Sequence, residues 1–106
     1  MLALKEIPEL RLTHSQIQAQ VSQFLRVDGY FVFPNRQDQL SYAGISDLTA
    51  IKDGRIIWIE IKTDRDTQNP KQIKFQKDIE ENDGEYRVAR SIDDIEDLCE
   101  GRIKFI

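Results

Sequence analysis

Hydrophobic and polar residues alternate most regularly between residues 47 and 62, which read DLTAIKDGRIIWIEIK. β-branched and aromatic residues are frequent on both sides of Asp53-Gly54, and this pattern predicts two strands. An Asp-Gly pair favours a two-residue type I′ turn, because that turn needs positive φ at both central positions. The stretch therefore predicts a tight β-hairpin, around which the rest of the chain is arranged.

The length of the turn also fixes which residues face each other. Counted outward from a loop of Asp53 and Gly54, the pairing places Asp47 opposite Glu60. Facing side chains share one face of the sheet, with Cβ atoms about 4.5–5.5 Å apart. Lys62 lies two residues beyond Glu60 and so shares that face. One face of the hairpin is thus predicted to carry two carboxylates and an ammonium group.

The opposite face of the hairpin is predicted to be wholly apolar. Its residues are Leu48, Ala50, Ile57, Ile59 and Ile61. An aliphatic surface of this kind must be buried against another element, and we expect a helix to cover it. The best candidate begins at Thr13 and ends at Gly29, because Thr13 with Gln16 matches a capping box. Its apolar stripe consists of Ile17, Val21, Phe24 and Leu25.

The remaining pattern completes an α/β arrangement. It predicts a strand at 30–33, a polar loop at 35–44, a helix from 69 to about 82, a strand at 85–90 and a short acidic helix at 91–99. Pro70 suits the first position of the second helix and Gly84 its cap, with Ile73, Phe75, Ile79 and Gln76 on or near its inward side. A helix between the second hairpin strand and the last strand favours a parallel crossover. The order αβββαβα predicts a mixed sheet flanked by helices on both faces.

Length and composition limit the possible classes of protein. We expect the 106 residues to form one domain, residues 1–106, with a single core. The sequence has no apolar run near the ~20 residues of a membrane span and no signal-peptide pattern. Cys99 is the only cysteine, which excludes an internal disulfide, and we expect it to be a small buried residue. We therefore expect a soluble protein of the cytoplasm.

The net charge of −4 is unusual for a protein that binds nucleic acid. However, five of the nineteen acidic residues lie between Asp93 and Glu100, and the rest of the chain is close to neutral. Modest, salt-sensitive DNA affinity is compatible with this distribution. Arg36, Gln37, Ser41 and Tyr42 in the polar loop are candidates for contacts with phosphate or sugar.

The pair Asp47 and Glu60 has a direct electrostatic consequence. Two carboxylates about 5 Å apart repel each other by roughly 1 kcal/mol in water and roughly 3 kcal/mol at an effective dielectric constant near 20. Lys62 offsets part of this repulsion, and a divalent cation would offset more. Hard oxygen ligands suit Mg²⁺ or Mn²⁺. From the geometry alone, a surface hairpin with scattered charges remains an equal alternative to a metal site.

These residues resemble a known nuclease pattern. Ser46-Asp47 followed by Glu60-Ile61-Lys62 across a hairpin resembles the PD-(D/E)XK nuclease superfamily. Segments GISDL (44–48), NPKQ (69–72), GEYRVARS (84–91) and HSQIQ (14–18) resemble the VRR-NUC branch of that superfamily, in its small stand-alone form from phages and bacteria. The likeness spans roughly residues 13–98, nearly the whole chain.

The resemblance implies a metal-dependent DNA endonuclease that hydrolyses phosphodiester bonds. Asp47, Glu60 and the backbone carbonyl of Ile61 would bind Mg²⁺ or Mn²⁺. Lys62 would orient or activate the attacking water, and Gln72 would contact that water or a phosphate oxygen. For Gln72 the alternative is a contact only within its own helix. The expected products are a 5′-phosphate and a 3′-hydroxyl.

The substrate and assembly implied by the resemblance are branched or junction DNA, as for Holliday-junction resolvases, and a homodimer. Tyr42, Phe105 and Ile106 are candidate interface residues. Two departures from the family pattern stand out: Ser46 replaces a proline, and His14 replaces a glutamate of the first helix, where a surface histidine is the preferred interpretation. The alternatives are a non-catalytic module that binds nucleic acid or protein, and an exonuclease or restriction-like nuclease.

Overall fold

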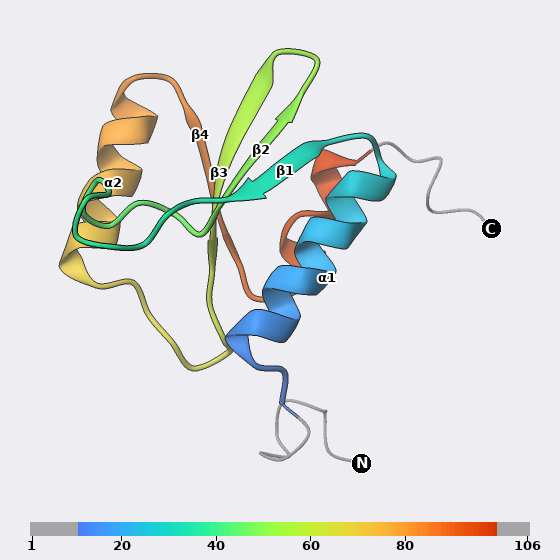
Figure 1. Ribbon diagram of the computed structural model, residues 1–106, viewed down its shortest axis with the longest axis horizontal. Helices are drawn as coiled ribbons and strands as arrows, with labels where there is room; N and C mark the ends of the chain where they lie inside the picture. Colours follow the sequence, from blue (N-terminus) through green and yellow to red (C-terminus); the bar gives the residue numbers. More distant parts are fainter. Residues whose placement is uncertain (1–10, 100–106) are drawn as a thin grey trace.

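The computed structural model describes residues 11–99, which form a four-stranded mixed sheet between helical layers (Figure 1). The two α-helices are α1 (His14–Val27) and α2 (Pro70–Glu81). The strands, in the spatial order β1-β2-β3-β4, are β1 (Phe31–Pro34), β2 (Leu48–Lys52), β3 (Arg55–Ile61) and β4 (Glu85–Ala89). Two 3₁₀ turns follow, η3 (Ile92–Asp94) and η4 (Glu96–Leu98). This arrangement confirms the predicted α/β class with a mixed sheet flanked by helices.

The central hairpin has the predicted turn and the predicted register. Asp53 and Gly54 have φ values of 52° and 83°, as a type I′ turn requires. Lys52 pairs with Arg55 and Leu48 pairs with Ile59, so the next facing pair outward is Asp47 and Glu60. After the crossover through α2, β4 pairs in parallel with β3, also as predicted.

The hydrophobic core lies between α1 and one face of the sheet. In Figure 1 α1 lies on one side of the sheet and α2 on the other. From α1 the core takes Ile17, Val21 and Leu25, and from the sheet it takes Val32, Leu48, Ala50, Ile57, Ile59, Ile61 and Ala89. Ile95 and Leu98 of the acidic segment close the same core, and Cys99 packs against it. The predicted apolar face of the hairpin is therefore sealed by the predicted helix.

The α2 layer is smaller and more polar. Phe75 is its one buried residue, and its ring lies 6.1 Å from that of Tyr86 on β4. Ile79 is half-buried, whereas Ile73 is 53% exposed, so the prediction that Ile73 faces inward is wrong. Ile73 lies two residues before Phe75, so on a helix it points away from the face that Phe75 and Ile79 share.

Two predicted details of helix ends differ from the structure. The acidic segment forms two separate 3₁₀ turns rather than one helix, because Ile95 adopts a non-helical conformation between them (φ −131°, ψ 2°). In α2 the left-handed residue after the helix is Asp83 (φ 61°), not Gly84. Asp83 and Gly84 donate their N–H groups to the carbonyls of Glu80 and Ile79, which is a Schellman motif. Gly84 is still required, because a Cβ there would lie 2.7 Å from the Ile79 side chain.

The outer edge of β1 is partly closed by Arg26 of α1 and by Pro34. Asn35 N–H donates to the Asp47 carbonyl, so by alternation the backbone groups of Val32 point away from β2. The guanidinium of Arg26 on α1 donates to the Val32 carbonyl at 3.0 Å. Pro34, the next outward-facing residue, has no N–H to offer.

None of the helices within residues 11–99 is long and apolar enough to cross a membrane.

Candidate active site

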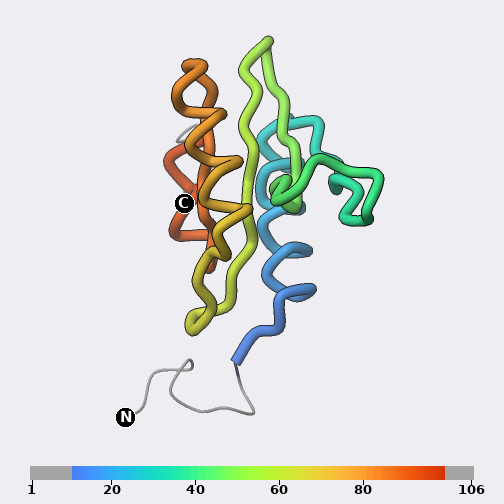
Figure 2. Tube along the Cα trace, turned by 90° about the vertical axis from the view of Figure 1, so that its left-hand side faces the viewer, coloured from blue at the N-terminus to red at the C-terminus, as the bar shows by residue number. Residues whose placement is uncertain are grey.

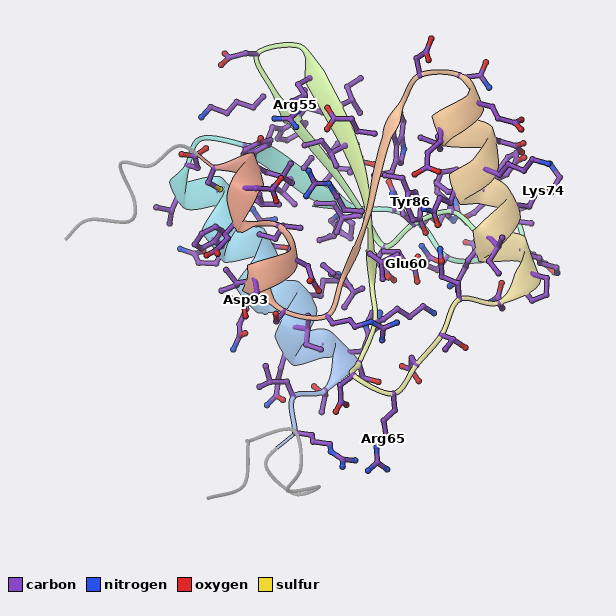
Figure 3. The ribbon with its side chains drawn as sticks, turned by 180° about the vertical axis from the view of Figure 1, so that it is seen from behind. Arg55, Glu60, Arg65, Lys74, Tyr86 and Asp93 are labelled. Atoms are coloured by element: carbon purple, nitrogen blue, oxygen red, sulfur yellow. The ribbon has the colours of Figure 1, made fainter. Side chains whose placement is uncertain are left out.

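The side chains predicted to form a site come together at the C-terminal end of β3. There the strand lies beside the first turn of α1, and the loop 62–69 leads into α2 (Figure 1). Figure 3 shows Glu60 and Tyr86 directed from the sheet toward α2, while Lys74 lies on the outer side of that helix. Glu60, Lys62 and Gln72 contact one another. Asp47 is bonded to the backbone of Ile61, between Glu60 and Lys62, and His14 lies beside Asp47.

Asp47 holds its position by replacing a backbone bond of the sheet. In a regular ladder the N–H of Ile61 would donate to the carbonyl of Ser46. Instead it donates to Asp47 Oδ2 at 2.8 Å. The Asp47 carboxylate is thereby pinned across the end of β3, with its side chain only 14% exposed.

The displaced Ser46 carbonyl is satisfied by a network that the sequence did not reveal. Asn35 and Gln37 donate their side-chain amides to it at 3.0 and 2.9 Å. The other end of the Asn35 amide accepts from Thr49 Oγ1 at 2.8 Å, and Ser46 is itself fully buried. These bonds fix the segment that enters β2 and therefore fix Asp47. Asn35 directly follows the short strand ended by Pro34, but nothing in that position signalled a partner eleven residues away.

Glu60 is the buried carboxylate of the site, with 2% of the residue exposed. Its Oε2 accepts from Gln72 Nε2 at 2.9 Å and lies 3.5 Å from Lys62 Nζ. Its Oε1 is buried and has no hydrogen-bond partner. Burial, together with the nearby Asp47 carboxylate, raises the pKa of Glu60 to about 7, and Lys62 only partly opposes this shift.

Lys62 and Gln72 connect the sheet to α2. Lys62 Nζ donates to Gln72 Oε1 at 2.9 Å, and the same oxygen accepts from the N–H of Asn69 at 3.0 Å. Asn69 Oδ1 in turn accepts from the N–H of Gln72, so the two residues form a capping box at the start of α2. Gln72 therefore caps its own helix and also contacts Glu60 and Lys62, so its contacts are not confined to that helix. Its predicted contact with the attacking water or a phosphate oxygen stays a prediction.

A glycine brings the loop that precedes β2 against the start of α2. Gly44 has a φ of 79°, and a Cβ at this position would lie 2.2 Å from the carbonyl oxygen of Lys71. Only glycine fits such an approach, since both the dihedral angle and the space exclude a side chain. The contact couples the segment that carries Asp47 to the helix that carries Gln72. The loop of residues 35–46 otherwise projects from the side of the molecule (Figure 2).

His14 is exposed, as preferred from the sequence, but it is not remote from the site. Its Nε2 lies 3.3 Å from Asp47 Oδ2. The loop residues proposed for DNA contact are mostly occupied elsewhere: Gln37 supports Ser46, Arg36 pairs with Asp38, and Tyr42 donates to Asp78. Ser41 bonds to the Asp38 carboxylate. Within residues 35–42, the structure thus gives these side chains roles in holding the loop.

The arrangement suits a divalent cation, although it does not contain a complete cluster of ligating side chains. Among residues 11–99, no three His, Cys, Asp or Glu side chains are arranged as metal ligands. Two carboxylates do converge, and the buried Oε1 of Glu60 has no partner of its own. Burial and the Glu60 carboxylate also raise the pKa of the Tyr86 hydroxyl, which accepts from Gln68 beside the site. A bound cation would satisfy the orphaned oxygen and remove the repulsion.

A comparison with solved structures identifies the fold. A structure described as a VRR_NUC domain matches this chain with a TM-score of 0.68, over 80% of this chain and 91% of that one, at 18% sequence identity. The chain has the VRR_NUC fold. This result confirms the fold that the resemblance implied. By sequence, no family model and no curated protein matches the chain.

Proposed function

We propose that this VRR_NUC-fold domain is a metal-dependent endonuclease that hydrolyses phosphodiester bonds of DNA. The observation that carries the proposal is Glu60: a buried carboxylate with an unpartnered oxygen, next to Asp47 and Lys62, at the end of the central hairpin. A protein that needed these residues only for stability would gain nothing from such an arrangement, since a buried carboxylate without full pairing is destabilising.

The proposed ligands of Mg²⁺ or Mn²⁺ are Asp47, Glu60 and the backbone carbonyl of Ile61. The N–H of Ile61 points to Asp47 Oδ2. In an extended strand the N–H and the C=O of one residue point to the same side, so the Ile61 carbonyl is directed toward the side of β3 where Asp47 lies. All three donors are oxygens, which these ions prefer. The ion, when bound, would supply charge stabilisation at the phosphate and a lower pKa for a bound water.

The remaining roles fall to Lys62 and Gln72. Lys62 is held between Gln72 Oε1 and Glu60 Oε2, so its ammonium group has a fixed position beside the carboxylates. There it orients the attacking water and stabilises negative charge as the pentacovalent transition state forms. Gln72 positions Lys62 and Glu60. The N–H groups of Asn69 and Gln72 are already used in the capping box and Pro70 has none, so the start of α2 is not assigned a phosphate contact. The expected products are a 5′-phosphate and a 3′-hydroxyl.

The proposed substrate is branched DNA, with a four-way junction as the first candidate and a homodimer as the acting species. A two-fold junction presents two equivalent strands, and a symmetric pair of active sites would cut both. Of the interface candidates, Tyr42 is 55% exposed, whereas Phe105 and Ile106 lie outside the described residues.

One cleavage panel tests this proposal. The full chain is incubated with a four-way junction, a flap, a linear duplex and a single strand, each with Mg²⁺, Mn²⁺ or EDTA. We expect metal-dependent cutting of the branched substrates. A Glu81→Gln variant serves as the control, because Glu81 is an exposed carboxylate on α2 away from the cluster. Binding without cleavage in any metal would favour a non-catalytic module, and degradation from ends would favour an exonuclease.

A further inference from the structure

A pocket of about 290 Å³ opens between α2, β3 and the loop of residues 35–46, beside the candidate site. Aromatic side chains from three segments line it: Tyr42 from the loop, Trp58 from β3 and Phe75 from α2. The Phe75 ring lies 5.7 Å from that of Tyr42 and 6.1 Å from that of Tyr86. The volume of this aromatic pocket is at the lower end of the ~300–1,000 Å³ typical of small-molecule sites. It therefore suits a single flat ring system.

The aromatic pocket lies on the same face of the sheet as Glu60. Trp58 and Glu60 are two residues apart on β3, so their side chains share a face and their Cα atoms are roughly 6.6–6.8 Å apart. Tyr86 pairs with Trp58 across β3 and β4, and Figure 3 shows both Tyr86 and Glu60 directed toward α2. Stacked bases of a DNA strand follow one another at about 3.4 Å. A base in the pocket would therefore lie within about two or three nucleotides of a phosphate at Glu60.

The ring of Tyr42 is held at the pocket by its hydroxyl group. The hydroxyl donates to Asp78 Oδ2, and the residue is nevertheless 55% exposed, so much of its ring can meet a ligand. Lys74 Nζ donates to the same carboxylate oxygen at 2.7 Å, which places a cation beside the acidic group of the rim. Asp78 and Asn82 line the pocket and supply polar groups that can bond to the edge of a base.

Lysines on α2 supply positive charge for a strand that passes the pocket. Lys71, Lys74 and Lys77 are exposed and three residues apart, so they follow one side of the helix from the candidate site toward the pocket. Lys74 and Lys77 also pair with carboxylates of the same helix, at 2.7 and 3.9 Å. Aromatic rings for bases beside cations for phosphates are the combination that binds single-stranded nucleic acid.

We infer that the aromatic pocket holds an unpaired base of the DNA strand that enters the site, and that this contact makes the domain prefer branched substrates. The inference rests on the proposed function, because it takes DNA as the substrate. A base inside a duplex must lose its pairing and stacking before it can enter a pocket, whereas a base at a flap or junction is already unpaired. The pocket thus rewards the structure of the substrate rather than its sequence.

The chain carries its own reporter for this contact, because Trp58 is its only tryptophan. The full chain is titrated in EDTA with a flap DNA, with a fully paired duplex of the same length, and with the same flap lacking the unpaired base beside the branch. We expect the flap to quench the fluorescence of Trp58 and the duplex to leave it nearly unchanged. The abasic flap should bind about 5- to 150-fold more weakly than the intact flap, the loss expected for one stacked base.

Variants of Tyr42 provide the second readout, through the Kd of labelled DNA. Tyr42→Ala should raise the Kd for the flap about 5- to 150-fold and that for the duplex less than about twofold. On the abasic flap it should cause no further loss, because the base that it contacts is missing. Tyr42→Phe keeps the ring and should retain the affinity. Phe31→Ala is the matched control, since Phe31 is a 63% exposed aromatic residue outside the pocket.

The outcomes separate this inference from the proposed function. Equal losses on flap and duplex in Tyr42→Ala, or no binding of the flap in EDTA, would overturn the inference. Loss of a dimer in Tyr42→Ala with unchanged flap affinity would assign the pocket to a second copy of the chain and overturn it as well. If the expected binding is seen but no metal ion supports cleavage, the pocket stands and the endonuclease proposal fails. If branched DNA is cleaved and Tyr42→Ala binds the flap like the parent, the endonuclease proposal stands and the pocket is overturned.

Discussion

The two faces of the β2–β3 hairpin use the same strands for opposite purposes. Toward α1, Ile57, Ile59 and Ile61 are fully buried among aliphatic side chains. Toward α2, Glu60 is equally buried but carries an oxygen without a partner. Successive residues of a strand point to opposite faces of the sheet. Ile59 and Ile61 therefore lie in the hydrophobic core, whereas Glu60 between them lies in a polar cluster with an unpaired oxygen.

This difference shows where the chain gains stability and where it gives some up. The α1 face supplies the apolar burial that folds the domain. The α2 face holds two carboxylates near one another, an arrangement that costs free energy until a cation or a proton neutralises it. Variants at neighbouring positions of β3 should therefore separate stability from chemistry.

The largest expected effect is on cleavage in Glu60→Gln. Removing the charged ligand should lower the rate in Mg²⁺ at least about a thousandfold, or about 4 kcal/mol of transition-state stabilisation. The fold should be retained, because glutamine has the same shape and can still accept from Gln72. Single-turnover cleavage of a four-way junction, with circular dichroism as a check on folding, measures both. Cleavage at the parental rate would show that the α2 face is not the active site.

Ile59→Ala, at the neighbouring position of β3, should lower the stability of the fold and leave the cleavage activity of the folded protein intact. Ile59 is fully buried, and truncation leaves a cavity against α1 that should cost about 2–5 kcal/mol of unfolding free energy. The folded fraction should still cleave at close to the parental rate when corrected for population. Urea unfolding measures the loss. A loss below about 1 kcal/mol would mean that the α1 face is not the main source of stability.

The stability of the protein should depend on pH because of Glu60 on the α2 face of the sheet. The pKa of Glu60 in the folded protein is raised to about 7, above its ordinary value near 4.5. Between these values the native protein holds a proton that the unfolded chain has released, so the unfolding free energy should fall as pH rises. We expect a decrease of about 1–3 kcal/mol from pH 5 to pH 8 in EDTA. Urea unfolding at both pH values, with Glu60→Gln as the flat reference, measures it; the same slope in both proteins would exclude Glu60 as the cause.

The smallest expected effects are those of two variants at the start of α2. They distinguish the role of Gln72 in capping its helix from its contacts with Lys62 and Glu60. Asn69→Ala removes the cap of α2 and should cost about 1 kcal/mol of stability with little change in cleavage. Gln72→Ala breaks the same capping box and also frees Lys62 and Glu60, so cleavage should fall about tenfold or more. Thermal unfolding and cleavage rates of both variants are compared. Equal cleavage losses would mean that Gln72 acts only through its helix.

Features set by local chemistry could be predicted from the sequence. The Asp53-Gly54 turn determined the register, and the register placed Asp47 opposite Glu60. Alternation separated the polar face from Ile57, Ile59 and Ile61, and Asn69-Pro70 marked the start of α2. Each of these depends on residues close together in the chain or directly paired across one turn.

Features set by the path of a loop could not be predicted. The support of Ser46 by Asn35 and Gln37, and the approach of Gly44 to Lys71, depend on where residues 35–46 run in space. The same holds for His14, whose contact with Asp47 joins the first helix to the far end of the hairpin. A short polar side chain has many possible partners, and only the folded backbone selects one.

The Arg26 guanidinium on the Val32 carbonyl, together with Pro34, has a consequence for self-association. An incoming chain that tried to add a strand beside β1 would find one acceptor already taken and one donor missing. Growth of the sheet into fibrils from this side is therefore disfavoured. A symmetric pair of molecules would therefore have to join at another surface rather than by continuing the sheet at β1.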